Sequence, residues 1–518
     1  MSIVFPCFNF SVNEKYAFGG KLTSDILREA RRYEEVAEQY IEKSDRPDYH
    51  LSTRTGWMND PNGFSYYNGQ YHLFYQYYPY EAKWGPMHWA HAVSDDMLHW
   101  HYLPAALAPD TLSDRDGCFS GSAVDLPDGR HLLIYTGVVS AGRHLGDLEK
   151  VIQHQCLAVG DGIDYEKYAE NPVLDGDDVP EGCSKEDFRD PKIWREADGS
   201  YRCIVAVRPA DGSGMILLYS SNDAFHWKFE SILAENKNRF GKMWECPDFF
   251  ELDGRYVLLT SPQDMLPSGF EYHNGNGTLC LIGSFDETTK KFHDEFDQAI
   301  DYGIDFYATQ TMVTPDGRRV MIAWMQNWDT LAIIRHKARW FGQMTIPREL
   351  SVRNNRLYQW PIRELETLRR NKVEYHNVLC NGEMRFDGVR GRHIDMTVKI
   401  RPADANASYE KFGLWFAENE LYHTSLSFHP SDSIMKIDRK FSGSRRAVIH
   451  QRRAMISHRN GELTFRMILD LYSAEIFLND GEQTITITLY TDHDADGIKF
   501  ITDGNVILDI EKYDLVMD

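Results

Sequence analysis

The chain has 518 residues and a formal net charge of −22, from 78 acidic and 56 basic side chains. A chain of this length exceeds one ordinary hydrophobic core and predicts at least two domains. The acidic excess argues against a nucleic acid or an anionic membrane as a partner, because both require a basic patch. No stretch approaches the ~20 apolar residues of a membrane span.

The N-terminal extension, residues 1–49, is expected to contain one helix over residues 24–43. Ile26, Tyr33 and Tyr40 fall on one face of this helix, and Ser24 is a candidate N-cap. We expect it to pack outside the next domain or at a subunit contact, which leaves a homo-oligomer open. The first residues lack a basic segment followed by an apolar one, so a cytoplasmic location is expected.

An internal repeat runs through residues 50–359. Each copy is a turn dipeptide followed by a mostly apolar strand, as in Asn68-Gly69 before QYHLFYQYY. The other turns are Asp128-Gly129, Asp198-Gly199, Asp253-Gly254 and Asp316-Gly317. Asn-Gly and Asp-Gly favour tight hairpins because the central residues adopt positive φ. Spacings of 55 to 70 residues suit blades of about four strands, so we predict a five-bladed β-propeller.

Carboxylates recur at one position of this repeat. The residues eight before each turn are Asp60, Ser120, Asp190, Glu245 and Ala308. If the strand before each turn is the innermost strand of its blade, these side chains converge on the central channel. The repeat therefore predicts that three acids from different blades lie close together.

The pattern changes after this repeat. Residues 360–371 have a helical composition and are expected to form a linker. Residues 372–518 contain short alternating strands such as HIDMTVKI and QTITITLY, separated by polar turns. This pattern predicts a C-terminal β-sandwich. The expected fold is therefore all-β: a propeller followed by a sandwich, with one short N-terminal helix.

Two carboxylates that face each other can break a glycosidic bond. Asp60, beside Asn59, is expected to stay ionised and to act as the nucleophile. Glu245, among aromatic residues and other acids, is expected to have a raised pKa and to act as the acid/base. Asp190, beside Arg189, would stay charged and hold sugar hydroxyls. Each acid alone would be read as a turn residue or a surface pair; their shared position favours catalysis.

Calcium bound by these acids is the competing interpretation, because calcium takes oxygen ligands. The chain has no D-x-D-x-D-G loop, and the acids are spread over distant blades. Its eight cysteines form no CxxC pair, so a zinc site is not indicated either. We expect neither a metal nor a cofactor.

The motifs together resemble glycoside hydrolase family 32, the invertases and fructanases. WMNDPNG, FSGS, FRDPK, ECPD, DFYA and GQMTIPREL occur in order between residues 57 and 350. AEIFLNDGE (474–482) is similar to the family's sandwich signature, although DLYSAE (470–475) departs from the usual Asp-x-Ser-Ser-x-Glu form.

The resemblance implies that Asp60 forms a covalent fructosyl intermediate, Glu245 is the acid/base, and Asp190 stabilises the transition state. It further implies that the pocket for the terminal fructose is formed by Asn59, Gln76, Trp84, Phe119, Ser120, Arg189 and Trp324. The two tryptophans could instead belong to the cores of their blades.

The expected activity is that of a retaining β-fructofuranosidase, which hydrolyses the terminal β-fructofuranosyl bond of sucrose or short fructo-oligosaccharides. Within the family, a fructosyltransferase or a sucrose-6-phosphate hydrolase remains an alternative. The phosphate would need basic groups such as Arg143, His144 and Lys150. Outside it, the alternatives are a catalytically dead sugar-binding propeller and an arabinose- or xylose-releasing enzyme of related fold.

Overall fold

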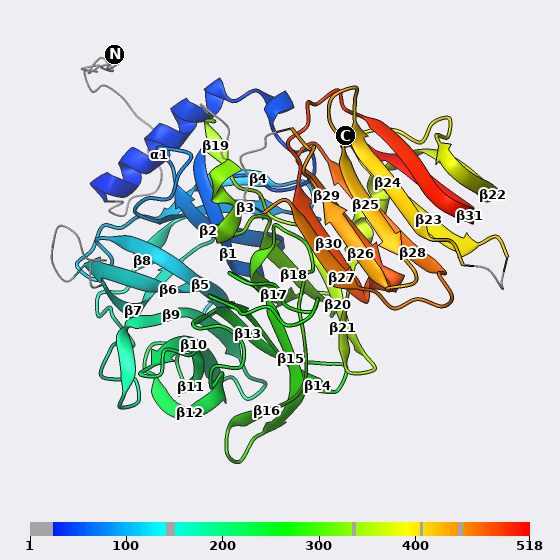
Figure 1. Ribbon diagram of the computed structural model, residues 1–518. Coiled ribbons are helices and arrows are strands. Elements are labelled where there is room, and N and C mark those ends of the chain that lie inside the picture. Colours follow the sequence, from blue (N-terminus) through cyan, green and yellow to red (C-terminus); the bar gives the residue numbers. More distant parts are fainter. Residues whose placement is uncertain (1–23, 141–150, 334–337, 405–407, 444–448, 518) are drawn as a thin grey trace.

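The computed structural model describes residues 24–140, 151–333, 338–404, 408–443 and 449–517. The chain begins with α1 (Asp25–Ala37), followed by the 3₁₀ turns η1 (Glu38–Tyr40) and η2 (Lys43–Asp45). The α-helix is thus shorter than residues 24–43. Ser24 is its N-cap, and its hydroxyl accepts the Leu27 amide at 3.0 Å. The helix packs on β4 at the outer edge of the first blade (Figure 1).

Five antiparallel sheets follow in chain order and form the five-bladed propeller. Blade 1 contains β1 (Gly56–Tyr67), β2 (Gln70–Tyr78), β3 (His88–Ser94) and β4 (His101–Leu107). Blade 2 contains β5 (Gly117–Asp125), β6 (His131–Ser140), β7 (Val151–Gly160) and β8 (Tyr165–Lys167). Blade 3 contains β9 (Cys183–Arg195), β10 (Tyr201–Pro209), β11 (Met215–Ser221) and β12 (Lys228–Glu235). Blade 4 contains β13 (Trp244–Leu252), β14 (Arg255–Pro262), β15 (Leu279–Asp286) and β16 (Lys291–Gln298). Blade 5 contains β17 (Tyr307–Val313), β18 (Arg319–Trp324), β20 (Arg348–Arg353) and β21 (Arg356–Pro361).

The strand before each predicted turn is the innermost strand of its blade. β1, β5, β9, β13 and β17 contact one another in succession, and β17 contacts β1, so the ring is closed. The short strand β19 (Trp340–Phe341) pairs in parallel with the start of β1 and links the last blade to the first. This arrangement confirms the predicted propeller.

The five turns are of two kinds. Asn68-Gly69 and Asp253-Gly254 have positive φ at both residues, as a two-residue hairpin requires. In the other three blades the loop between the strands is five residues long, and of its turn dipeptide only the glycine has positive φ. The dipeptides therefore mark the turns correctly, but loop length decides the turn type.

Each innermost strand carries a β-bulge where it approaches the centre. The register shifts between Met58 and Pro61 in β1, and between Glu245 and Asp248 in β13. Corresponding shifts occur in β5, β9 and β17. A bulge leaves residues unpaired and turns their side chains. The propeller thus exposes one short unpaired segment from each blade at its centre.

This register corrects one step of the sequence argument. In the bulges of β9, β13 and β17, Asp190, Cys246 and Ala308 share a positive φ of 64°, 49° and 54°. Cys246, rather than Glu245, therefore occupies the position of Asp190. Counting back from the turn fails in blade 4 because β1 has a second bulge after Asn62, and blades 2, 3 and 5 have two loop residues before the turn dipeptide, whereas β13 has neither.

The segment 360–371, expected to be a helical linker, is helical in its middle half and extended at its ends. β21 continues to Pro361, the 3₁₀ helix η4 covers the 6 residues Arg363–Leu368, and β22 (Arg369–Met384) begins directly afterwards. Trp360 and Pro361 belong to the last propeller strand, where β21 pairs with β20.

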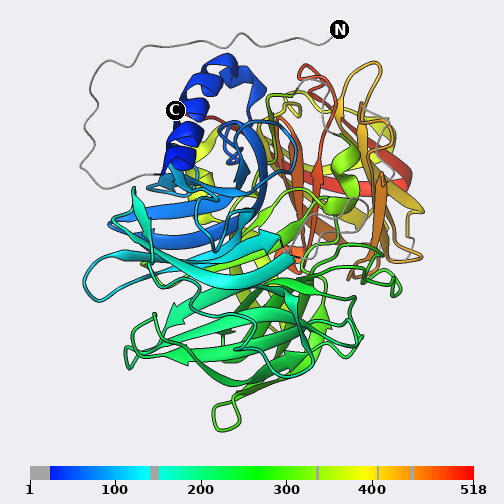
Figure 2. The ribbon, with the colours of Figure 1, turned by 90° about the vertical axis from the view of Figure 1, so that its left-hand side faces the viewer.

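The C-terminal part is the predicted β-sandwich, seen beside the propeller in Figures 1 and 2. One half of the long strand β31 (Gly497–Leu515) pairs with β23 and the other half with β24, so this strand belongs to both layers. The first layer contains β23 (Ile394–Pro402), β28 (Leu463–Asp470), β29 (Ser473–Leu478) and β30 (Gln483–Thr488). The second contains β24 (Lys411–Glu418), β25 (Thr424–His429), β26 (Ile434–Asp438) and β27 (Gln451–Met455). Buried side chains from both layers form one apolar core.

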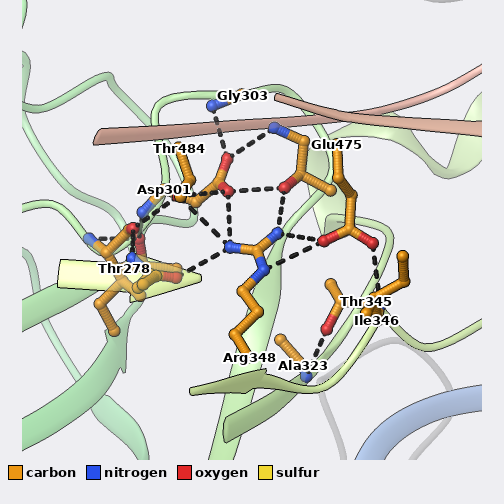
Figure 3. Close-up of polar contacts among 12 residues, drawn as sticks. Thr278, Asp301, Gly303, Ala323, Thr345, Ile346, Arg348, Glu475 and Thr484 are labelled. Atoms are coloured by element: carbon orange, nitrogen blue, oxygen red, sulfur yellow. Dashed lines mark hydrogen bonds and ion pairs between the residues drawn. The ribbon is translucent and has the colours of Figure 1, made fainter. Parts of the chain in front are cut away.

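Fully buried charges join the propeller to the sandwich (Figure 3). The Arg348 guanidinium of β20 donates to Glu475 of β29 at 3.0 and 2.6 Å and to Asp301 at 3.2 Å. Asp301 also accepts the hydroxyls of Thr484 and Thr486 on β30, at 3.0 and 2.6 Å. Charges this deeply buried are stable only when every polar atom is matched. The two domains therefore form one continuous structure.

Candidate active site

A cavity of about 640 Å³ opens at the bulged ends of the innermost strands. Four of these strands supply Asn59, Asp60, Phe119, Ser120, Arg189, Asp190 and Glu245 to its wall. The remaining lining residues are Gln76, Trp84, Gln153, Asp187, Gln263, Asp264, Asn276 and Trp328. The three acids singled out by the repeat therefore share one cavity.

Cys246 lies between Asp60 and Asp190. Its backbone N–H donates to Asp190 Oδ2 at 2.9 Å, and its Sγ lies 3.5 Å from Asp60 Oδ2. Asp60 also accepts the Ser120 hydroxyl at 2.7 Å and the Asn59 side-chain amide at 3.0 Å. These donors hold the Asp60 carboxylate in one orientation.

Glu245 is held by two other side chains. The Arg189 guanidinium donates to its Oε1 from Nη2 at 2.9 Å and from Nε at 3.2 Å. The Tyr307 hydroxyl, from the fifth blade, donates to Oε2 at 2.6 Å. Arg189 also pairs with Asp187 at 2.7 Å. Glu245 is therefore positioned by blades 3 and 5, although its own strand belongs to blade 4.

The pKa values of Asp60 and Asp190 follow from their burial and from the charges around them. Burial raises the pKa of Asp60, and the charge of Glu245 adds to this effect, while the hydrogen bonds from Ser120 and Asn59 oppose it. Burial also raises the pKa of Asp190 to about 7, and Arg189 lowers it less than burial raises it. Arg189 therefore does not hold the pKa of Asp190 at its ordinary value.

A retained proton matters for the chemistry of this cluster. Carboxylates that share a cavity resist full ionisation, because each charge raises the pKa of the others. Cleavage of a glycosidic bond requires one ionised and one protonated carboxyl group. Asp190, whose pKa burial raises to about 7, can keep one proton in this cavity near neutral pH.

Six of the seven residues expected in the pocket line the cavity: Asn59, Gln76, Trp84, Phe119, Ser120 and Arg189. Trp84 is 49% exposed and stands at the mouth, with its ring edge-on to Phe119. Trp324 is different: it is fully buried against Trp57 and Tyr307 and does not line the cavity. Trp324 belongs to the core, because its side chain, at the end of β18, packs against neighbouring strands and not into the channel.

Trp328, four residues later, occupies the wall instead. It begins the 3₁₀ segment η3 (Trp328–Ile333), and its ring stacks on Trp57 with centroids 6.0 Å apart. Tyr307, in the DFYA motif (305–308), was not among the residues predicted for the site. That motif was a signal available for Tyr307; nothing local marked Asn276 or Gln153. The basic residues considered for a phosphate, Arg143, His144 and Lys150, lie outside the described residues.

Among the residues that the structure describes, no group of three or more His, Cys, Asp or Glu side chains is arranged to hold a metal ion. The same part of the chain has no helix long and apolar enough to cross a membrane.

Comparison with known proteins agrees with the site. The model for the glycosyl hydrolases family 32 N-terminal domain matches residues 50–361, and that for the family 32 C-terminal domain matches residues 364–514. The chain is 38% identical over 478 residues to the raffinose invertase of Escherichia coli, covering 89% of this chain and 94% of that protein. It is 33% identical to the sucrose-6-phosphate hydrolase of Bacillus subtilis, covering 88% and 92%.

Solved structures show the same architecture. A mutant of the Bombyx mori GH32 beta-fructofuranosidase BmSUC1, in complex with sucrose, superimposes with a TM-score of 0.77 at 33% identity, covering 94% of this chain and 97% of that one. Sucrose-6-phosphate hydrolase from Lactobacillus gasseri gives 0.79 at 26% identity, covering 96% and 97%. With both family models matched over nearly all of residues 50–514, the chain belongs to glycosyl hydrolase family 32.

Proposed function

We propose that the protein is a retaining β-fructofuranosidase that releases terminal fructose from sucrose and short fructo-oligosaccharides. The observation that carries this proposal is the meeting of Asp60, Asp190 and Glu245 in one cavity, with Cys246 contacting both aspartates and Arg189 binding Glu245. The names of the relatives, invertases and β-fructofuranosidases, support the same substrate class.

In the proposed mechanism, the Asp60 carboxylate attacks the anomeric carbon of the fructosyl unit while Glu245 gives its proton to the departing oxygen. A covalent fructosyl–Asp60 ester results. Glu245 then takes a proton from water, whose oxygen attacks the same carbon and releases Asp60. Two inversions give net retention. Asp190 accepts hydrogen bonds from fructose hydroxyls, and Arg189 and Tyr307 keep Glu245 in place.

A neutral substrate fits the charges of the wall. Among the described lining residues, five are acidic (Asp60, Asp187, Asp190, Glu245 and Asp264) and one is basic. That one, Arg189, already binds Glu245 and Asp187. A phosphate would meet like charges at this wall and would lose affinity. Sucrose is therefore favoured over sucrose 6-phosphate.

The function is tested by comparing kcat/KM for sucrose, sucrose 6-phosphate, 1-kestose and inulin. We expect sucrose to exceed sucrose 6-phosphate by about tenfold or more. NMR during turnover should show that the first fructose released is the β-anomer. A preference for sucrose 6-phosphate would reverse the substrate assignment, and α-fructose as first product would exclude a nucleophilic Asp60. Product analysis at high sucrose separates hydrolysis from fructosyl transfer.

Ser120 provides a test by pH. Its hydrogen bond favours the charged form of Asp60, so Ser120→Ala should raise the pKa of Asp60 further. Activity that requires ionised Asp60 is lost as the pH falls, and this acid limb of kcat/KM should move to higher pH by about one unit. Ser122→Ala is the control, because the Ser122 hydroxyl binds Pro191 O and the Ile193 amide instead. If the acid limb of kcat/KM does not move in Ser120→Ala, that limb reports the ionisation of a group other than Asp60.

The cytoplasmic location and a homo-oligomeric state stay predictions.

A further inference from the structure

One wall of the cavity is built by the turn at residues 326–330. Trp328 lines the cavity directly. The carboxylate of Asp329 accepts the backbone N–H of Asn276 at 2.8 Å and its side-chain amide at 3.1 Å. Asn276 also lines the cavity. Gly275 permits this approach, because a Cβ there would lie 2.2 Å from Asp329 Oδ2. The turn therefore fixes two lining residues.

The buried carboxylate of Asp305 anchors this turn. The Thr330 hydroxyl donates to Asp305 Oδ1 at 3.0 Å and accepts the Gln326 amide at 3.1 Å. Asp305 is 0% exposed and Thr330 is 1% exposed. Asp305 is also two residues before Tyr307, which binds Glu245. A shift of Asp305 would therefore displace both the turn that carries Trp328 and the strand that carries Tyr307.

The β-sandwich holds Asp305 from the other side. Arg439, directly after β26, forms a buried ion pair with it. Thr488 of β30 donates to Asp305 Oδ2 from its backbone N–H at 2.8 Å and from its hydroxyl at 2.9 Å. Burial lowers the pKa of Arg452 of β27, and the charges of Asp305 and Asp329 oppose this effect. Contacts thus run without interruption from the sandwich to the cavity wall.

We propose that Asp305 is a positioning residue through which Arg439 of the β-sandwich sets the Trp328 wall of the substrate cavity. The sandwich thereby contributes to substrate binding although none of its described residues lines the cavity. The physical basis is that the buried Asp305 carboxylate has hydrogen-bond donors on both sides. If the donors on one side move, the carboxylate must follow them, because a broken hydrogen bond would leave a buried charge unsatisfied. This inference rests on the proposed function.

The neighbouring carboxylate Asp301 offers a matched control. Asp301 accepts hydroxyls from the same strand β30 and pairs with an arginine, Arg348, as Asp305 does. Its other partners are Gly303 and the threonines of β30, not the turn at 326–330. Both carboxylates thus tie the domains together, but only Asp305 touches the wall.

The experiment compares Thr330→Val with Thr484→Val, each of which removes one buried hydroxyl from its carboxylate. Thr330→Val should raise the KM for sucrose about fivefold, the effect of one buried hydrogen bond, with a smaller change in kcat. Thr484→Val should leave both constants within about twofold while lowering the unfolding midpoint to a similar extent. The same constants are then compared between Arg439→Lys and Arg348→Lys, which alter the arginine partners of Asp305 and Asp301.

A double-mutant cycle tests that the effect passes through Trp328. In a Trp328→Ala background, Thr330→Val should change KM by less than about twofold, because the group it positions is gone. Equal KM changes in Thr330→Val and Thr484→Val, or a full effect without Trp328, would overturn the inference. Failure of the wild-type enzyme to hydrolyse any fructoside would instead contradict the proposed function.

Discussion

Replacing Asp60 by Asn is expected to reduce kcat by roughly four orders of magnitude or more, since the removal of a nucleophile from a hydrolase has effects of this size. The Asn amide can still meet Ser120 and Asn59, but it cannot attack the anomeric carbon. Burial raises the pKa of Asp60, so its charged form is less stable in this cavity than in water. Loss of the charge should therefore leave the unfolding midpoint unchanged or slightly higher.

Chemical rescue makes this prediction specific to the nucleophile. In Asp60→Ala, azide can enter the space of the missing carboxylate and attack the fructosyl carbon of a substrate with a good leaving group. The product should be the fructosyl azide of inverted configuration. In Glu245→Ala, azide would attack the covalent intermediate and give the retained configuration. If Asp60→Ala gave the retained azide and Glu245→Ala the inverted one, Glu245 would be the nucleophile and Asp60 the acid/base.

Glu475→Ala is expected to lower the free energy of unfolding by about 3–5 kcal/mol, the usual effect of leaving a buried charge without its partner. Glu475 is fully buried and accepts hydrogen bonds from Arg348, from His50 at 2.9 Å and from the Ile346 amide at 2.8 Å. The measurement is the urea midpoint at unchanged slope. A midpoint within error of wild type would show that the interface does not depend on this carboxylate.

Asp496→Ala is the control for this variant. Asp496 pairs with Arg390 at 2.7 Å, but the two side chains are 34% and 69% exposed. Exposed pairs contribute at most about 1 kcal/mol, because water and salt screen them. The comparison separates the effect of burial from the loss of an ion pair as such.

The same interface predicts a pH dependence of stability. Burial lowers the pKa of His50, but its bonds to Asp470 and Glu475 outweigh burial and raise the pKa to about 9. The folded state therefore binds a proton that the unfolded state releases above about pH 6.5. His50 contributes its full stability below that pH, and the contribution is lost as the pH rises through 9. In Glu475→Ala this alkaline loss should be smaller.

Much of the architecture follows from the sequence because its signals are local. Turn dipeptides and strand alternation each depend on a few neighbouring residues, and they predicted the five blades and the equivalent positions of Asp60 and Asp190. The family resemblance pointed to the same Glu245 and added six residues that line the cavity. The family and the all-β fold were predicted correctly for the same reason.

The remaining features depend on contacts between distant segments. A second bulge in β1 and the longer loops of blades 2, 3 and 5, neither visible in the sequence, made Glu245 appear in phase with the other acids. The same holds for Asp190: burial by the surrounding blades, not its neighbour Arg189, sets its pKa. Trp324, at the end of β18, is packed into the core, whereas Trp328, in the 3₁₀ segment η3, lines the cavity. The sequence by itself determined the propeller, the sandwich and the acids at the centre. Only the tertiary structure decided the strand register, the burial of the acids and the residues of the cavity wall, because these arise where separate blades and domains meet.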